Sequence, residues 1–102
     1  MKYRGGILLS GRELEVVTYV IENSPVSLVD LENWIMKRYN LSLSAAYKIV
    51  YKLKKSNILR YRRFRNKIFV EVTPEFIATI TKLYALLLSR EALRVRYFEQ
   101  QR

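Results

Sequence analysis

Apolar residues recur at helical spacing from the first residues after position 10. Ser10 stands three residues before Glu13, which is the spacing of a capping box at the start of a helix. The apolar positions that follow are Leu14, Val17, Val20 and Ile21. Because these positions share one side of a helix with 3.6 residues per turn, the pattern predicts a helix over residues 11–22 with this side buried.

A second helix is predicted after Pro25, which interrupts the first. Ser27 is suited to cap it, with Asp30 three residues further on, and Asn40 suits a left-handed ending after residue 38 or 39. The side expected to be buried holds Leu28, Leu31, Trp34 and Ile35.

A third helix is predicted to begin at a cap formed by Ser42 or Ser44 and to end at Asn57. Its apolar stripe is expected to comprise Ala46, Ile49, Val50 and Leu53. The side away from this stripe holds Tyr47, Lys48, Tyr51, Lys52 and Lys55. The third helix is therefore expected to pair a buried apolar side with a cationic and aromatic one.

The stretch ILRYRRFRNKIFVEV, residues 58–72, alternates with period two and predicts a β-hairpin turning at Arg65-Asn66. One face is expected to hold the pairs Leu59 with Val72, Tyr61 with Val70 and Arg63 with Ile68. The other is expected to hold Arg60 with Glu71, Arg62 with Phe69 and Phe64 with Lys67. The turn type stays open, but the base of the hairpin is expected to join the core while its tip projects as a cationic wing.

Thr73 and Pro74 form a typical helix start, as cap and first helical residue. The apolar positions that follow are Phe76, Ile77, Ile80, Leu83, Tyr84, Leu87 and Leu88, with Val95 and Phe98 near the end. Ser89 could restart the chain as a separate helix. The stripe could pack on its own domain, but it is longer than one small core needs, which favours a dimer interface.

Composition narrows the class of protein. The 102 residues suffice for a single domain, half of them apolar, with no cysteine and no histidine. A disulfide framework, a thiolate metal site and the commonest general base are therefore excluded. No phosphate loop and no metal cluster is found, so we expect no enzyme, no cofactor and no evident small-molecule ligand. The apolar run near the start is too short for a signal sequence and no stretch suits a membrane, so a cytoplasmic protein is expected.

Charge is concentrated in one segment. Of the 19 Lys and Arg residues, 11 lie between Asn33 and Val70, where there is no Asp or Glu. The rest of the chain holds 8 basic and 9 acidic residues, so this segment accounts for the whole net charge of +10. A local field of one sign indicates a protein that binds a polyanion.

The order of helix, helix, helix, hairpin and helix, with these charges, resembles the winged helix-turn-helix family of DNA-binding proteins, in the style of the MarR and PadR regulators. The matching stretch is SPVSLVDLENWIMKRYNLSLSAAYKIVYKLKKSNILRYRRFRNKIFVEVTPEF, and the resemblance covers about residues 10–77. Asn57 and Phe76 stand where the family pattern has glycine. The composition, rich in Ile, Tyr, Lys and Arg, also looks like that of small regulators of hyperthermophilic archaeal viruses and plasmids, for which the location would be the host cytoplasm.

The resemblance implies a mainly α fold with a small β-hairpin wing (α+β) and a long C-terminal helix, in one domain over residues 1–102. The recognition helix would lie in the major groove of double-stranded DNA, with the wing on the flanking backbone or minor groove. The candidate DNA-binding residues are Ser42, Ser44, Tyr47, Lys48, Tyr51, Lys52, Lys55, Arg62, Arg63, Arg65 and Lys67. Residues 73–102 would form a homodimer through Ile80, Leu83, Tyr84, Leu87, Leu88, Val95 and Phe98.

A sequence-specific transcription regulator is the leading hypothesis. A protein that coats DNA or RNA without specificity would use the same cationic face, and a protein-interaction module would use the last helix. Structural roles for the same residues also stay open: Tyr47 and Tyr51 could be ordinary packing, and the hairpin arginines could protect an edge strand.

Overall fold

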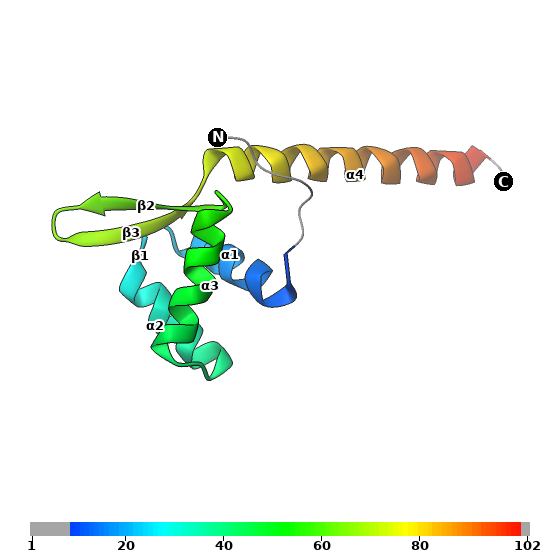
Figure 1. The fold of residues 1–102 in the computed structure, drawn as a ribbon. Helices are drawn as coiled ribbons and strands as arrows, with labels where there is room; N and C mark the ends of the chain where they lie inside the picture. The colour runs from blue at the N-terminus through cyan, green and yellow to red at the C-terminus, as the bar shows by residue number, and fades with distance from the viewer. Residues whose placement is uncertain (1–8, 101–102) are drawn as a thin grey trace.

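The computed structural model describes residues 9–100, and it describes side chains as far as residue 90. The elements in chain order are α1 (Gly11–Asn23), β1 (Val26–Ser27), α2 (Leu28–Tyr39), α3 (Leu43–Lys55), β2 (Leu59–Phe64), β3 (Lys67–Val72) and α4 (Pro74–Gln100). In Figure 1, the first three helices form a compact body, the hairpin projects from it, and α4 runs away in the opposite direction. The expected α+β winged fold with a long C-terminal helix is confirmed.

The first helix begins at the capping box predicted from the sequence. The Glu13 amide donates to Ser10 Oγ at 3.1 Å, and the Ser10 amide donates to Glu13 Oε1 at 2.9 Å. The buried side of α1 differs from the prediction, since it comprises Glu13, Val16, Val17 and Val20.

The expectation that Leu14 and Ile21 are buried is wrong, because they are 54% and 50% exposed. The reason is the orientation of α1, which turns Glu13 toward α3 and places Val16 and Val20 at the centre of the buried arc. Leu14 and Ile21 then fall beyond its edge.

Caps define the next two helices. Ser27 accepts from the Asp30 amide at 3.1 Å, and α2 ends at Asn40, whose φ of 54° is left-handed. Ser42 rather than Ser44 caps α3, because its Oγ accepts from the Ala45 amide at 3.2 Å. Asn57, with a φ of 62°, redirects the chain after α3 into the wing.

The hairpin has the predicted register at all of the expected pairs, from Leu59 opposite Val72 to Phe64 opposite Lys67. Arg65 takes a left-handed φ of 56° in the turn. A third strand, β1, was not predicted: Val26 pairs with Val70 and places β1 on the other edge of β3. Two residues are too few to show an alternating pattern in the sequence.

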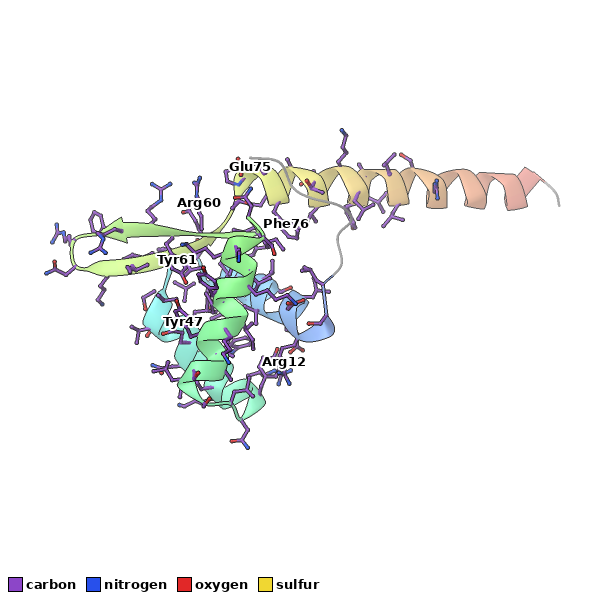
Figure 2. All side chains as sticks on the ribbon, viewed as in Figure 1. Arg12, Tyr47, Arg60, Tyr61, Glu75 and Phe76 are labelled. Carbon is purple, nitrogen blue, oxygen red and sulfur yellow. The ribbon has the colours of Figure 1, made fainter. Side chains whose placement is uncertain are left out.

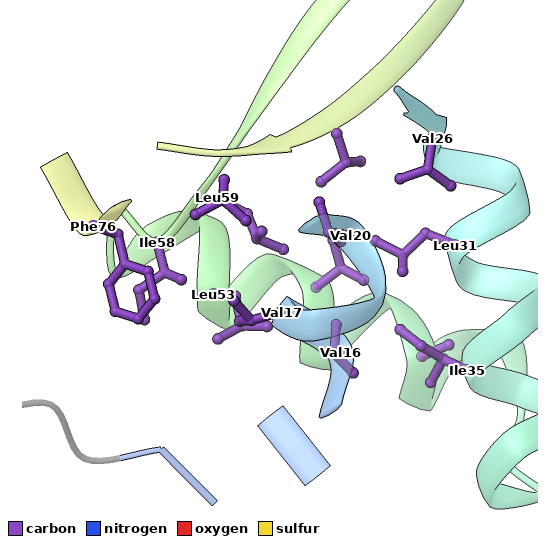
Figure 3. Close-up of a cluster of buried hydrophobic side chains, with 14 residues drawn as sticks. Val16, Val17, Val20, Val26, Leu31, Ile35, Leu53, Ile58, Leu59 and Phe76 are labelled. Carbon is purple, nitrogen blue, oxygen red and sulfur yellow. The ribbon is translucent and has the colours of Figure 1, made fainter. Parts of the chain in front are cut away.

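The hydrophobic core lies between the three helices and the inner face of the sheet, and Figure 3 shows its members converging. The side chains that are almost fully buried include Val16, Val20, Leu31, Ile35, Val50, Leu53, Leu59, Val70 and Phe76. All four helices and both hairpin strands contribute to this set, and Val26 of β1 is also buried, so the body and the base of the wing form one packed unit.

Thr73 joins the wing to the last helix. Its amide donates to the carbonyl oxygen of Ile58 at 2.9 Å, and its hydroxyl donates to the carbonyl oxygen of Asn57 at 2.7 Å. The same hydroxyl accepts from the Phe76 amide at 3.2 Å, which caps the start of α4. The end of α3, the return strand of the wing and α4 therefore meet at one residue.

The last helix is continuous through Ser89, and among its side chains described, to residue 90, those that contact the core lie at its beginning. Phe76 is 1% exposed in the core and Ile80 is partly buried against it. The next apolar residues of the stripe are largely exposed: Leu83, Tyr84, Leu87 and Leu88. Between Leu83 and Leu88 the stripe therefore does not pack on its own domain, whereas its start at Phe76 and Ile80 does.

Replacing Phe76 with alanine tests this anchor. Phe76→Ala is expected to lower the free energy of unfolding by about 3 kcal/mol or more, because it removes a fully buried ring at the junction of α4 with the core. Leu86→Ala, at a position on the same helix that is 59% exposed, is the control and is expected to change stability by less than about 0.5 kcal/mol. Urea denaturation at a fixed protein concentration measures both, and equal losses in the two variants would contradict the anchoring role.

Candidate nucleic-acid interface

The outward side of α3 carries the polar residues that the sequence singled out. Ala46, Val50 and Leu53 are buried on its inner side. The opposite side presents exposed Ser44, Tyr47, Lys48, Tyr51 and Lys55. Because spacings of three and four residues share a helix face, Ser44, Lys48, Tyr51 and Lys55 form one row along the helix.

Tyr47 lies next to this row, one turn before Tyr51. Their rings are stacked, with centroids 5.8 Å apart and planes inclined by 13°. They remain 49% and 43% exposed, so packing against the core does not account for them. Lys54 extends over the ring of Tyr61 in β2, with its ammonium 4.8 Å from the ring centroid, and so links α3 to the wing.

Tyr61 and Glu32 lie at the inner edge of this tyrosine group. Burial raises the pKa of the Tyr61 hydroxyl, and Tyr47, the Glu32 carboxylate and Tyr51 raise it further. Burial also raises the pKa of the Glu32 carboxyl. The Tyr61 hydroxyl has no hydrogen-bond partner among the described residues. It therefore stays a neutral donor at the junction of α3 with the wing.

Lys52 has a partner that the sequence did not reveal. Its Nζ lies 2.9 Å from Oε2 of Glu13, whose side chain is only 10% exposed, while the Lys52 side chain keeps 71% of its surface exposed. Burial alone would raise the pKa of Glu13, but hydrogen bonds from Lys52 and the Ser10 amide outweigh it and lower that pKa. Lys52 thus ties α3 to the first turn of α1.

At the base of the wing, two arginines share one carboxylate. Glu71 accepts a hydrogen bond from Arg60 and lies 3.3 Å from the Nε of Arg62. The hydrogen bond from Arg60, followed by that from Arg62, holds the pKa of the Glu71 carboxyl below its usual value. Arg62 therefore shares the Glu71 carboxylate with Arg60.

The tip of the wing carries cations with no carboxylate partner within the described part of the chain: Arg63, Arg65 and Lys67. The Arg65 guanidinium lies over the ring of Phe64, 5.3 Å from its centroid. Phe64 is 60% exposed. The tip thus combines cationic and aromatic side chains in solvent.

Two cations of the basic segment, Lys37 and Arg38, lie elsewhere, on α2. Arg38 on α2 pairs with Glu15 of α1 at 3.1 Å, and Tyr39 donates its hydroxyl to the same carboxylate. The hydrogen bond from Tyr39, followed by that from Arg38, lowers the pKa of Glu15. This network joins α1 to α2 and neutralises the charge of Arg38 there.

The fold therefore divides the predicted DNA-binding residues into three groups. Exposed residues without a carboxylate partner in the described chain are Ser44, Tyr47, Lys48, Tyr51, Lys55, Arg63, Arg65 and Lys67. Lys52 and Arg62 are exposed but ion-paired, and Ser42 is the helix cap. Sequence reasoning passed over Lys54 and Phe64. For Phe64 a signal was available in the sequence, because the predicted hairpin register placed it next to the turn.

No protein-family model matches the chain, and no curated protein matches it. Several solved structures match it. A ZitR mutant from Lactococcus lactis aligns at a TM-score of 0.56 and 13% identity, covering 100% of this chain and 68% of that one. The homodimeric winged helix-turn-helix DNA-binding domain Mb0332 of Mycobacterium bovis, described as a possible ArsR-family transcriptional regulator, aligns at 0.55 and 16% identity, covering 81% and 72%.

The F-93 protein of the virus SSV1 aligns at a TM-score of 0.57 and 16% identity, covering 87% of this chain and 99% of that one. These likenesses establish a winged helix-turn-helix fold, in agreement with the resemblance found in the sequence. In this fold the β2–β3 hairpin is the wing, and it follows directly after α3. Among the described residues, no helix is long and apolar enough to cross a membrane.

The ion pair between Glu13 and Lys52 makes a pH-dependent prediction. The folded pKa of Glu13 lies below its ordinary value of 4.5, so the stabilisation is present at neutral pH and is lost as the pH falls through the folded value. Glu13→Gln keeps a side chain that can complete the capping box but removes the charge. The wild type is expected to be more stable than this variant at pH 7, by up to about 1 kcal/mol.

The measurement is the difference in unfolding free energy between wild type and Glu13→Gln from pH 7 to pH 3. Taking the difference cancels the contributions of Glu15 and Glu71, whose pKa values are also lowered. The difference is expected to vanish at the acid end. A difference that does not change with pH would rule out the charge of Glu13 as its source.

Proposed function

We propose that this chain is a homodimeric, sequence-specific transcription regulator that binds double-stranded DNA. The observation that carries the proposal is the distribution of charge on the fold. The exposed side of α3 and the tip of the wing hold lysines and arginines without a carboxylate partner in the described chain, whereas the acidic Glu13, Glu15 and Glu71 are taken up by other cations. Such a face suits a polyanion whose backbone runs along it.

Helix α3 is proposed to enter the major groove. Lys48 and Lys55 extend from the exposed row and are suited to guanine acceptors or phosphates, and Ser44 near the helix start is suited to a phosphate. Tyr47 and Tyr51 offer rings for thymine methyl groups and hydroxyls for phosphates. Ser42 and Lys52 support this helix as its cap and as its link to α1, so their effect on binding is proposed to be indirect.

The wing is proposed to reach the flanking DNA. Arg63, Arg65 and Lys67 at its tip are suited to phosphates or to a narrow minor groove, and Arg62 adds charge at their base. The fit of a hairpin tip in the minor groove depends on the sequence there, so the wing would add shape readout to the contacts of α3.

The last helix is proposed as the dimer interface, with residues 10–77 as the DNA-binding core. The stripe continues from partly buried Ile80 into exposed Leu83, Tyr84, Leu87 and Leu88. Leaving these apolar side chains in water is unfavourable, and a second copy of the chain would remove them from it. The predicted contacts Val95 and Phe98 lie beyond the described side chains. The Mb0332 domain is a homodimer with the same fold. Two copies would present two recognition helices to half-sites about 34 Å apart.

Two further hypotheses use the same surfaces. A protein that coats nucleic acid would bind any sequence with similar affinity, and a protein-interaction module would need α4 but not α3. The likeness to F-93 is in line with the proposed origin in an archaeal virus or plasmid.

Replacing the two lysines of the exposed row on α3, Lys48 and Lys55, tests the role of this helix. Lys48→Ala with Lys55→Ala is expected to weaken DNA binding by tenfold or more, and to reduce the slope of log K against log salt by about 2, because each phosphate contact contributes about 0.9 to that slope in B-DNA. Lys82→Ala with Arg90→Ala on α4 removes the same charge elsewhere and is the control. Footprinting with a salt titration on a selected site measures both pairs. An equal loss of affinity in both double variants would show that only net charge matters. It would favour a protein that coats nucleic acid without specificity.

Charges within the apolar stripe test the dimer. Leu87→Asp with Leu88→Asp is expected to give monomers and to weaken binding to a two-half-site operator by tenfold or more, because a carboxylate buried at an interface is strongly disfavoured. Sedimentation measures the oligomeric state and circular dichroism the fold. Leu86→Asp, on the other side of α4, is the control. A wild type that is monomeric at micromolar concentration would contradict the proposed interface.

A further inference from the structure

The outer face of the sheet, on the side away from the hydrophobic core, carries a groove that α3 does not line. It is lined by Ser24 and Pro25 before β1, Arg62 and Phe64 of β2, and Phe69, Val70 and Glu71 of β3, with a volume of about 340 Å³. In Figure 2, Arg60 and Tyr61 point to opposite faces of β2, Arg60 outward and Tyr61 toward the body. Within residues 9–90 no element covers this outer face, where Arg60, Arg62, Phe64 and Lys67 are exposed.

Two aromatic rings shape the groove. Phe64 lies opposite Lys67 and Phe69 opposite Arg62, so the two phenylalanines are diagonal neighbours on one face. Phe64 is 60% exposed and Phe69 is partly buried. Neither contributes to the hydrophobic core, which lies on the inner face of the sheet. A groove lined by two phenylalanine rings, one of them well exposed, suits a flat ring that can stack there.

The rim of the groove is cationic. Arg60, Arg62 and Lys67 project from the same face and Arg65 lies over Phe64, while Glu71 is the one carboxylate in the lining of this groove. Even with Glu71 paired to Arg60 and Arg62, cations outnumber it there. This combination disfavours a neutral apolar partner and suits a flat aromatic ring bonded to an anion, which describes a nucleotide.

The position of the groove indicates where that nucleotide comes from. It begins at the wing tip, beside the cations proposed to contact DNA that flanks the recognition helix. We propose that the outer face of the wing binds an unpaired nucleobase, stacked against Phe64 and Phe69 with its phosphates held by Arg62, Arg65 and Lys67. The base belongs to a melted or single-stranded segment adjoining the duplex on α3. This inference rests on the proposed function, and makes the protein selective for a junction between double- and single-stranded DNA.

The experiment compares three ligands of the same duplex sequence: a blunt duplex, one with a tail of three thymidines, and one with a tail of three abasic nucleotides. The two tails carry equal numbers of phosphates, so the comparison isolates the bases. Each tail is placed at the 5′ end in one set and at the 3′ end in the other. Fluorescence anisotropy at fixed salt is expected to give about tenfold tighter binding to one thymidine-tailed duplex than to its abasic counterpart.

Variants of Phe64 then locate the contact. Phe64→Leu keeps the apolar volume but removes the flat ring, and is expected to abolish the thymidine advantage, measured as the ratio of thymidine-tail to abasic-tail affinity in the same variant. Phe64→Trp is expected to keep the advantage or increase it. Because Phe64 is exposed, both variants are expected to fold, and circular dichroism checks this.

The outcomes separate the inference from the function on which it rests. Normal binding to the blunt duplex with equal affinities for thymidine and abasic tails would overturn the stacking site and leave the regulator proposal standing. A thymidine advantage that survives in Phe64→Leu would also overturn it, by placing the base elsewhere. Failure to bind any of the three ligands would overturn the proposed DNA binding, and with it this inference.

Discussion

The hydrogen bonds of Thr73 hold together the three parts of the molecule on which its proposed function depends. Through the carbonyl oxygens of Asn57 and Ile58, Thr73 is fixed to the exit of α3, and through the Phe76 amide it starts α4. Since Thr73 is 1% exposed, these bonds are shielded from water and losing them would leave buried polar groups unpaired. The orientation of the wing and the direction of α4 are thereby both set relative to α3.

The charged side chains are divided between the joints of the fold and its exposed surfaces. The three ion-paired carboxylates sit at joints between elements: Glu13 between α1 and α3, Glu15 between α1 and α2, and Glu71 between the strands of the wing. Six of the cations left without such partners in the described chain lie on α3 and at the wing tip, and the other four lie on α1, α2 and α4. An even scatter of the same residues would give the same net charge but no directed field.

Local patterns in the sequence predicted what local physics determines. Ser10 and Ser27 identified helix starts, Asn40 an ending, and period-two alternation gave every pair of the hairpin, because these depend on neighbours in the chain or on one tight turn. Features that depend on distant residues were missed or wrong. The two-residue strand β1 exists only because Val26 meets Val70, and the exposure of Leu14 follows from the way α1 is rotated on the core. Equally, no spacing rule links Lys52 to Glu13, which lies on a different helix.

The helix α4, which begins after Thr73, also sets a distance by its length. At about 1.5 Å per residue, its 27 residues extend about 40 Å. In the proposed dimer, the spacing and angular phase of the two recognition helices on DNA would be fixed by where along α4 the copies meet. Each residue added between the joint and the interface would turn the DNA-binding body by about 100° around the helix axis. In that proposed complex, the length of this segment, and not only its apolar surface, would be constrained by the pitch of DNA.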